Sequence, residues 1–387
     1  MKKLFVKAHR KEIVFIIVIL SLLAILALLP TGFQKQEYRQ TEGVRAKVIS
    51  VNNSSINSSG FYKLGDQSVI IEIETGSHKG EQIQANNMLT GSLAVDKIFQ
   101  KGDKAWVLIG FNENNEINFA NMIDHYRIDK EILLIGVFAL AIIIFSGFTG
   151  VRTLLSITFA LLCIWKILMP AMLKGYHPLL VALIIGNMLT IVTLLLVAGF
   201  SKKAYAAIIS STTCSIITCI FAVIFGKLFN MHGAVLEGAE SLLYAGFMNL
   251  NLTSVFQAGI YLASSGAILD LAIDVSSALE EIINNSPNIT KAGLVKSGLN
   301  IGKTVVGSQT TTLIFAYMGS YITVMMVYMA QGTPLMNILN SKPIAAEILH
   351  TLVGCIGLVL VSPLTSLACG VIYNEAKKMS PTSISGG

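Results

Sequence analysis

The sequence predicts an all-α polytopic membrane bundle of about eight transmembrane helices, with a small β domain inserted after the first helix. Of its 387 residues, 53% are hydrophobic and only 13% are charged, whereas a soluble domain carries about a quarter charged residues. Apolar runs close to the roughly 20 residues that a membrane helix needs recur along the chain. One stretch, residues 31–129, is polar instead and contains strand-like runs.

The first apolar run extends from Ile13 to Leu29 behind a basic lead. A signal peptide has a shorter apolar core followed by a small-residue cleavage site. This run is longer and ends in Leu-Leu-Pro-Thr-Gly. We therefore expect residues 1–30 to form an uncleaved signal anchor with the N-terminus in the cytoplasm.

Residues 31–129 are rich in Asn, Ser and Gly between β-branched runs. Residues 104–110 and 116–122, for example, flank an Asn-Glu-Asn-Asn turn signal. About five strands in this length suggest a small twisted sheet or barrel, such as an OB- or SH3-like one. All five cysteines of the chain lie elsewhere, in apolar segments without metal-ligand spacing. This β domain therefore has no disulfide and depends on its own core.

Seven further apolar runs follow, at about 132–148, 153–170, 178–200, 205–226, 252–270, 308–330 and 344–372. Most Lys and Arg residues between them fall in loops on the side of the basic N-terminus. The positive-inside rule then predicts both termini in the cytoplasm and the β domain on the extracytoplasmic side of the cell membrane. Residues 130–375 form the seven-helix membrane domain in this scheme, and residues 376–387 form a cytoplasmic tail.

The distribution of Lys and Arg also indicates which kind of partner the chain has. Lys and Arg give a net charge of +6 but are scattered among loops. Because no basic block is present, we expect the lipid bilayer and not nucleic acid as the partner of this chain.

One helix combines a small-residue face with acidic side chains. Wound at about 100° per residue, residues 259–281 place seven positions on a stripe about 80° wide: Gly259, Ala263, Gly266, Asp270, Asp274, Ser277 and Glu281. Small residues let another helix approach closely. Acidic residues that continue such a face predict an ion, proton or substrate site.

The length of this helix sets the depth of its aspartates. If the span begins near Leu252, Asp270 lies about 27 Å along a core of about 30 Å, near its inner edge. Two interpretations stay open. Asp270 and Asp274 line a cytoplasm-facing ion site or gate, or the helix simply leaves the membrane and its carboxylates are solvated or paired with Lys291 or Lys296.

A second polar segment opens the next apolar run. Residues 302–312 read Gly-Lys-Thr-Val-Val-Gly-Ser-Gln-Thr-Thr-Thr, and their hydroxyls either bond neighbouring helices or turn toward Asp270. The side chains that we assign to the same site are Thr304, Ser308, Gln309, Thr311 and Thr312. We expect Gly302 and Gly307 to pack against other helices.

The sequence predicts no enzyme and no cofactor. Residues 298–304 resemble a phosphate loop but have three residues between the glycines, where such a loop has four. An intramembrane aspartyl protease needs aspartates from two helices, and Asp270 and Asp274 share one. No Ser/His/Asp or Cys/His arrangement stands out, and no residue is assigned to a metal.

Four motifs in order carry a resemblance to a known family: 101–103 (Lys-Gly-Asp), 124–127 (Asp-His-Tyr-Arg), 266–274 and 301–319. In these motifs, and over nearly its whole length, the chain resembles the YibE/F-like family of bacterial multi-pass membrane proteins. That family usually has an acidic residue and an Asn where this chain has Thr304 and Thr311. The resemblance implies the membrane architecture and a partner, either a related YibE/F-like membrane subunit or a second copy of the chain.

Two functions remain in view from the sequence. The first is a permease-like protein that moves an ion or small solute through the Asp270/Asp274 site. The second is a membrane scaffold or sensor without transport activity, in which the β domain binds an envelope partner and residues 270–306 bind a cytoplasmic one.

Overall fold

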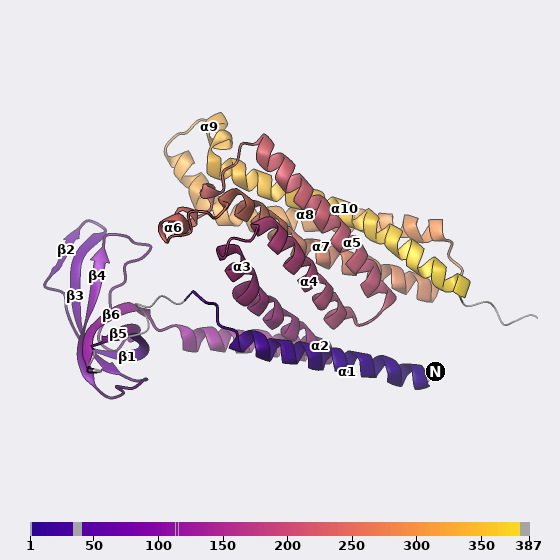
Figure 1. The fold of residues 1–387 in the computed structure, drawn as a ribbon. Coiled ribbons are helices and arrows are strands. Elements are labelled where there is room, and N and C mark those ends of the chain that lie inside the picture. Colours follow the sequence, from indigo (N-terminus) through magenta and orange to yellow (C-terminus); the bar gives the residue numbers. More distant parts are fainter. Residues whose placement is uncertain (1, 34–40, 113, 115, 380–387) are drawn as a thin grey trace, which may run out of the picture. The chain divides into compact units, whose positions relative to one another are not determined.

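The computed structural model describes residues 2–33, 41–112, 114 and 116–379, and it comprises two compact units (Figure 1). One unit is Gly32–Phe145, which contains all the strands. The other consists of Met1–Thr31 and Ser146–Gly387 and is helical. The predicted tail 376–387 lies mostly outside the described residues.

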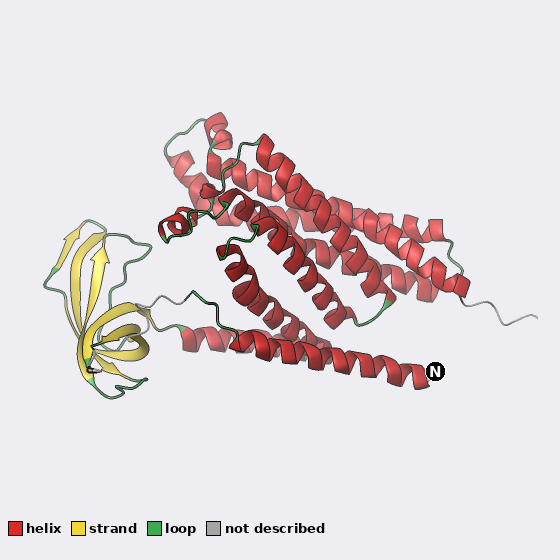
Figure 2. Cartoon of the chain, in the orientation of Figure 1, coloured by secondary structure: helices red, strands yellow, loops and turns green. Residues whose placement is uncertain are grey.

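The strands form a small closed barrel (Figure 2). They are β1 (Thr41–Asn52), β2 (Ile56–Ser59), β3 (Tyr62–Ile73), β4 (Gln82–Thr90), β5 (Lys104–Phe111) and β6 (Ile117–His125). The order β1-β5-β6-β4-β3 is closed by a β1–β3 pairing, and β2 extends it as a hairpin on β3. The β4–β6 pairing is parallel and the others are antiparallel. This five-stranded closure is that of an OB barrel, so the small β domain predicted after the first helix is confirmed.

Strict alternation of apolar residues produces the barrel core, because successive side chains of a strand point to opposite faces. Val44, Ala46 and Val48 of β1 and Val69, Ile71 and Ile73 of β3 are buried, and β5 adds Ala105, Val107 and Ile109. Phe99, from the segment between β4 and β5, fills the same core.

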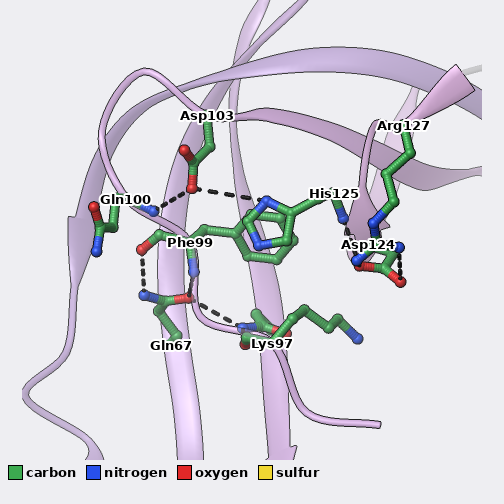
Figure 3. A network of polar contacts seen from close by, with 9 residues as sticks. Gln67, Lys97, Phe99, Gln100, Asp103, Asp124, His125 and Arg127 are labelled. Atoms are coloured by element: carbon green, nitrogen blue, oxygen red, sulfur yellow. Dashed lines mark hydrogen bonds and ion pairs between the residues drawn. The ribbon is translucent and has the colours of Figure 1, made fainter. Parts of the chain in front are cut away.

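A buried amide anchors that segment to the barrel. Gln67 of β3 is 0% exposed. Its Nε2 donates to the Phe99 carbonyl at 2.9 Å, and its Oε1 accepts from the Phe99 N–H at 3.0 Å (Figure 3). The Nε2 also donates to Asn53 Oδ1 at 2.9 Å, and the Oε1 also accepts from Asn87 Nδ2 at 3.0 Å. Every hydrogen-bonding site of the Gln67 amide group is engaged in this way, as a buried polar group requires.

The helical unit is built from long apolar helices and short connecting turns. Their bounds are α1 (Lys2–Leu28), α2 (Ile128–Cys163), the π-helical turn η2 (Ile164–Leu168), α3 (Met169–Leu173), α4 (Pro178–Ala198), α5 (Lys202–Leu228), the 3₁₀ turn η3 (Gly233–Val235), α6 (Ala239–Tyr244), α7 (Leu252–Asn285), α8 (Lys291–Ala330), α9 (Leu335–Asn340) and α10 (Lys342–Met379). Helix α7 is central, packing against α4, α5, α8 and α10.

Small residues and hydroxyls mediate the packing of these helices, as is usual between membrane helices. The buried face of α5 includes Ala206, Ala207, Ser210 and Ser211. Many buried hydroxyls bond within their own helix; Ser211 Oγ, for example, donates to the Ala207 carbonyl at 2.6 Å. All five cysteines are free and buried, which fits their predicted role as small apolar residues.

Between α5 and α10, two hydrogen bonds link side chains of the described residues to the opposite helix. Thr365 Oγ1 donates to Ser210 Oγ at 2.8 Å, and Cys214 Sγ donates to the Gly357 carbonyl at 3.0 Å.

Among the described residues, six helical segments are long and apolar enough to cross a membrane. The predicted first span falls on a shorter apolar segment of α1, Glu12–Leu28. The predicted second and third spans both fall in Ile128–Leu173, where the backbone leaves helical geometry at Gly147 (φ 57°, ψ −129°), a conformation that favours glycine. The apolar, mostly helical architecture is thus confirmed, while the count of eight spans stays a prediction.

Candidate functional site

The acidic stripe of α7 points away from the helix bundle. Ile268, Leu271, Ala272 and Val275 are fully buried on the opposite face. The exposed residues of the stripe are Ala263, Gly266, Asp270, Asp274 and Glu281, and its half-buried ones are Gly259 and Ser277. These residues therefore share one face of α7, and the described part of the chain leaves most of that face uncovered.

Neither aspartate of the stripe is paired. No described residue makes a hydrogen bond or ion pair with Asp270 or Asp274, which are one turn apart on an otherwise apolar segment. Glu281, two turns beyond Asp274, accepts a hydrogen bond from Asn285 Nδ2 at 2.9 Å. Of the alternatives that the sequence left open, pairing of these acids with Lys291 or Lys296 is not seen in the described part of the chain.

The polar segment of α8 is also exposed. Thr304, Gly307, Ser308, Thr311 and Thr312 are exposed, and Gln309 is half-buried. The Thr311 and Thr312 hydroxyls donate to the carbonyls of Gly307 and Ser308, at 3.0 and 3.1 Å. These hydroxyls therefore bond their own helix, and no described hydrogen bond joins them to the acidic stripe.

The glycines assigned to helix packing divide into two groups. A Cβ on Gly302 would collide with Ser362 of α10, so α8 and α10 approach most closely there. A Cβ on Gly259, Gly266 or Gly307 would meet no atom within 4 Å. Ala263 is exposed, as are Gly266 and Gly307, and Gly259 is half-buried. These small residues therefore mark a surface that no helix among the described residues packs against closely.

An ion-pair cluster closes the end of the bundle where α5 begins and α7 and α10 end. Lys203 Nζ lies 2.9 Å from Glu280 Oε2, and the Tyr373 hydroxyl donates to Glu280 Oε1 at 3.1 Å. Lys202 Nζ stands 5.6 Å from the centre of the Tyr373 ring. Glu280, which was not predicted from the sequence, turns inward, and the rotation of 100° per residue separates it from the exposed Glu281.

A buried acid on α10, Glu347, was also not predicted from the sequence. Glu347 is 7% exposed, and the Nδ1 of His350, one turn later, lies 3.9 Å from its Oε2. An acidic residue inside the apolar run 344–372 was the available signal, because such residues are costly in a membrane span and mark functional sites.

The two motifs of the β domain meet at one end of the barrel (Figure 3). Asp103 Oδ2 accepts from the Gln100 N–H at 2.8 Å and lies 3.8 Å from His125 Nδ1. Arg127 donates to both carboxylate oxygens of Asp124, at 2.7 and 2.9 Å. The hydrogen bond from Arg127 is the main cause that holds the pKa of Asp124 below its usual range.

A charged groove of about 610 Å³ lies beside these motifs, lined by residues of β5, β6 and the start of α2. Metal ligands are not evident there. Within the described ranges, no three His, Cys, Asp or Glu side chains are grouped so that they could hold a metal ion.

The long apolar helices of the bundle, six of them in the described residues long enough to cross a membrane, indicate a membrane protein with several spans. The chain belongs to the YibE/F-like family. The model of the YibE/F-like protein matches residues 134–375, and that of the YibE/F family N-terminal domain matches residues 38–126. Comparison with curated proteins and with solved structures gave no significant match.

Proposed function

We propose that this chain is a permease-like protein that moves an ion or small solute, with Asp270 and Asp274 as the ion or proton site. The observation that carries the proposal is the pair of unpartnered aspartates one turn apart on the central helix of the bundle. Two carboxylates at this spacing repel each other unless they share a cation or proton. An acid within a membrane span is costly unless it has such a role.

The proposed topology has eight spans, both termini in the cytoplasm and the barrel in the extracytoplasmic space. The distribution of Lys and Arg supports it through the positive-inside rule. Lys202 and Lys203 at the start of α5 and the acids at the end of α7 then lie at the cytoplasmic end. In this arrangement Asp270 and Asp274 stand near the inner membrane edge, where they act as a gate.

We expect conservative removal of either carboxylate to lower transport by about an order of magnitude or more, because one carboxylate alone cannot share the cation or proton. Flux driven by a pH or Na⁺ gradient is measured in proteoliposomes that contain the wild type, Asp270→Asn or Asp274→Asn. Glu240→Gln, at an exposed acid of α6 outside the stripe, is the control and should retain flux. Wild-type flux in both Asn variants would refute the site.

A second subunit completes this proposal. The small residues of α7 and the hydroxyl face of α8 are exposed where a lipid-facing helix is usually apolar. Gly, Ser and Thr on a helix surface favour close helix association in membranes. A second copy of the chain, or a related YibE/F-like subunit, would cover this face and enclose Asp270.

Ser308→Cys is expected to form an oxidative cross-link between subunits, because it introduces an exposed thiol on this face while the five native cysteines are buried. Cross-linked species are read from non-reducing gels of the chain in its native membrane, and of the purified chain. Ile216→Cys, at a 44% exposed position on α5, is the control and should remain monomeric. Equal cross-linking of the two variants, or none in either, would contradict an interface at α8.

The alternative function is a scaffold or sensor without transport. The charged groove of the barrel supports it, because Lys104, Arg127, Lys130 and Glu131 offer a polar surface for an envelope partner. Absence of flux for every ion and metabolite tested, with stable capture of a partner by the barrel, would favour this function over the permease.

A further inference from the structure

The charged groove of the barrel unit lies where the barrel passes into its first long helix. Gly102, Asp103 and Lys104 form one wall, from the loop before β5 and the start of that strand. The other wall comes from the end of β6 and the first turns of α2. Both polar and apolar atoms are accessible in these walls, and the volume of about 610 Å³ is within the range of small-molecule sites.

One face of α2 changes from charged to apolar as it leaves the groove. Arg127, Lys130, Glu131 and Leu134 all line the groove. Their spacing of three or four residues places them on the same side of the helix. Beyond Leu134, which is 70% exposed, the same face continues with Phe138, which is 51% exposed. A charged section and an apolar section therefore follow each other along one exposed face.

The charged section lies at the depth of lipid headgroups. The apolar run of α2 begins at Ile132 and belongs to a segment, Ile128–Leu173, that is long enough to cross a membrane. Arg127 precedes Ile132 by five residues, about 7 Å of helix, and the headgroup region on each side of a bilayer is about 5–8 Å thick. Tyr126 also lines the groove, with its ring centre 6.1 Å from that of Trp106. Such aromatic side chains are enriched at the membrane–water interface.

Charges of both signs line the groove without a hydrogen-bonded partner. Lys130 makes no hydrogen bond or ion pair with any residue that the structure describes. Lys104 Nζ lies 3.7 Å from Asp129 Oδ2, beyond hydrogen-bonding distance. The Glu131 carboxylate accepts no hydrogen bond from the described part of the chain. Two ammonium groups and one carboxylate are therefore available to a ligand.

We propose that this groove binds the headgroup of a phospholipid that carries both a phosphate and a primary ammonium. The phosphate oxygens accept hydrogen bonds from Lys104 and Lys130, and the lipid ammonium donates to Glu131. The acyl chains then lie along the exposed apolar face of α2, at Leu134 and Phe138. A phospholipid has the same order as this face, from charged headgroup to apolar chain.

The mixed charge of the groove separates this lipid from others. An anionic headgroup without an amine would bring its phosphate near Glu131 with no compensating cation, and like charges repel. Asp103, which also lines the groove, adds to that repulsion. A quaternary ammonium has no N–H to donate to a carboxylate. A lipid with a primary ammonium satisfies the charges of both signs.

This proposal goes beyond the permease and does not depend on the Asp270 site, so each stands or fails separately. It gives the groove a lipid as its occupant, whereas the scaffold alternative gives it an envelope partner.

The test compares three phospholipids with identical acyl chains. Binding of phosphatidylethanolamine, phosphatidylglycerol and phosphatidylcholine to the full, delipidated chain in detergent is measured by native mass spectrometry. We expect one saturable site that binds phosphatidylethanolamine about threefold to fivefold more tightly than the other two, the size of effect that an exposed ion pair gives. Glycerophosphoethanolamine, which has the same headgroup and no acyl chains, should not compete for this site.

Two variants test the assigned contacts. Lys130→Gln should weaken phosphatidylethanolamine binding by about threefold or more, and Glu131→Gln should abolish the preference for this lipid over the other two. Lys227→Gln, at an exposed lysine in the last turn of α5, is the matched control and should bind like the wild type. If gel filtration shows that Lys130→Gln does not fold, Lys104→Gln removes the other ammonium of the groove and should weaken binding in the same way.

Equal affinities for the three lipids would show general lipid binding and overturn the proposal. A preference that persists in Glu131→Gln, or unchanged affinity in the folded lysine variant, would also overturn it. Competition by glycerophosphoethanolamine would show a site for a soluble phosphate ester instead of a lipid.

Discussion

Gln67→Met is expected to destabilise the β-barrel by about 3 kcal/mol or more, although the two side chains are similar in size. The substitution leaves the Phe99 N–H, the Phe99 carbonyl and the Asn87 amide without their partner inside the barrel. Each buried polar group left unsatisfied costs about 1–3 kcal/mol. Hydrogen–deuterium exchange of the full chain should show faster exchange of the amides of β3, β4 and β5 in the variant.

The neighbouring strand offers a matched control. Gln84 of β4 is exposed, and its Nε2 donates a hydrogen bond of 3.0 Å to Ser68 Oγ. Gln84→Met should therefore change stability by no more than about 0.5 kcal/mol. If both variants exchange at the wild-type rate, the buried amide network does not stabilise the barrel.

Gly302→Val is expected to have the largest effect in the helical unit. The added Cβ would collide with the Ser362 hydroxyl and lie 2.8 Å from Ser362 Cβ, so α8 must move away from α10. Overpacking of this kind costs about 1–3 kcal/mol, which corresponds to a fall in melting temperature of roughly 2–12 °C for a unit of this size. Thermal unfolding of the purified chain in detergent measures this shift.

Gly307→Val tests whether the effect depends on the site and not on the residue type. No atom lies within 4 Å of a Cβ at Gly307, so this variant should retain the melting temperature of the wild type within about 2 °C. Similar losses of stability in the two variants would show that helix propensity, and not the α8–α10 contact, is responsible.

The fold was predictable where its signals are local. Apolar runs near the length of a membrane span predicted the long helices, and β-branched alternation, as at Val69 and Ile71, predicted strands. The closure of the barrel depends on pairings between distant residues, such as Ala46 with Ile73, which no local pattern specifies. The kink that separates two predicted spans at Gly147 depends equally on the backbone conformation of one residue.

In the candidate site, too, the features set by local sequence were predictable and those set by distant contacts were not. Helical spacing alone placed Asp270 and Asp274 on one face with Gly266. Whether that face is covered depends on which side of α7 its four neighbours occupy, and this is a property of the whole bundle. Gly302 and Gly307 likewise look equivalent in the sequence, yet only Gly302 is packed against α10.

The hydroxyl groups between α5 and α10 have a mechanical consequence. Ser211 and similar buried residues direct their hydrogen bonds to their own helix, so these bonds survive when one helix slides along another. Two side-chain hydrogen bonds of the described residues, from Thr365 and Cys214, would break in such a movement. Few polar contacts between α5 and α10 in the described part of the chain would therefore resist translation of one helix along the other.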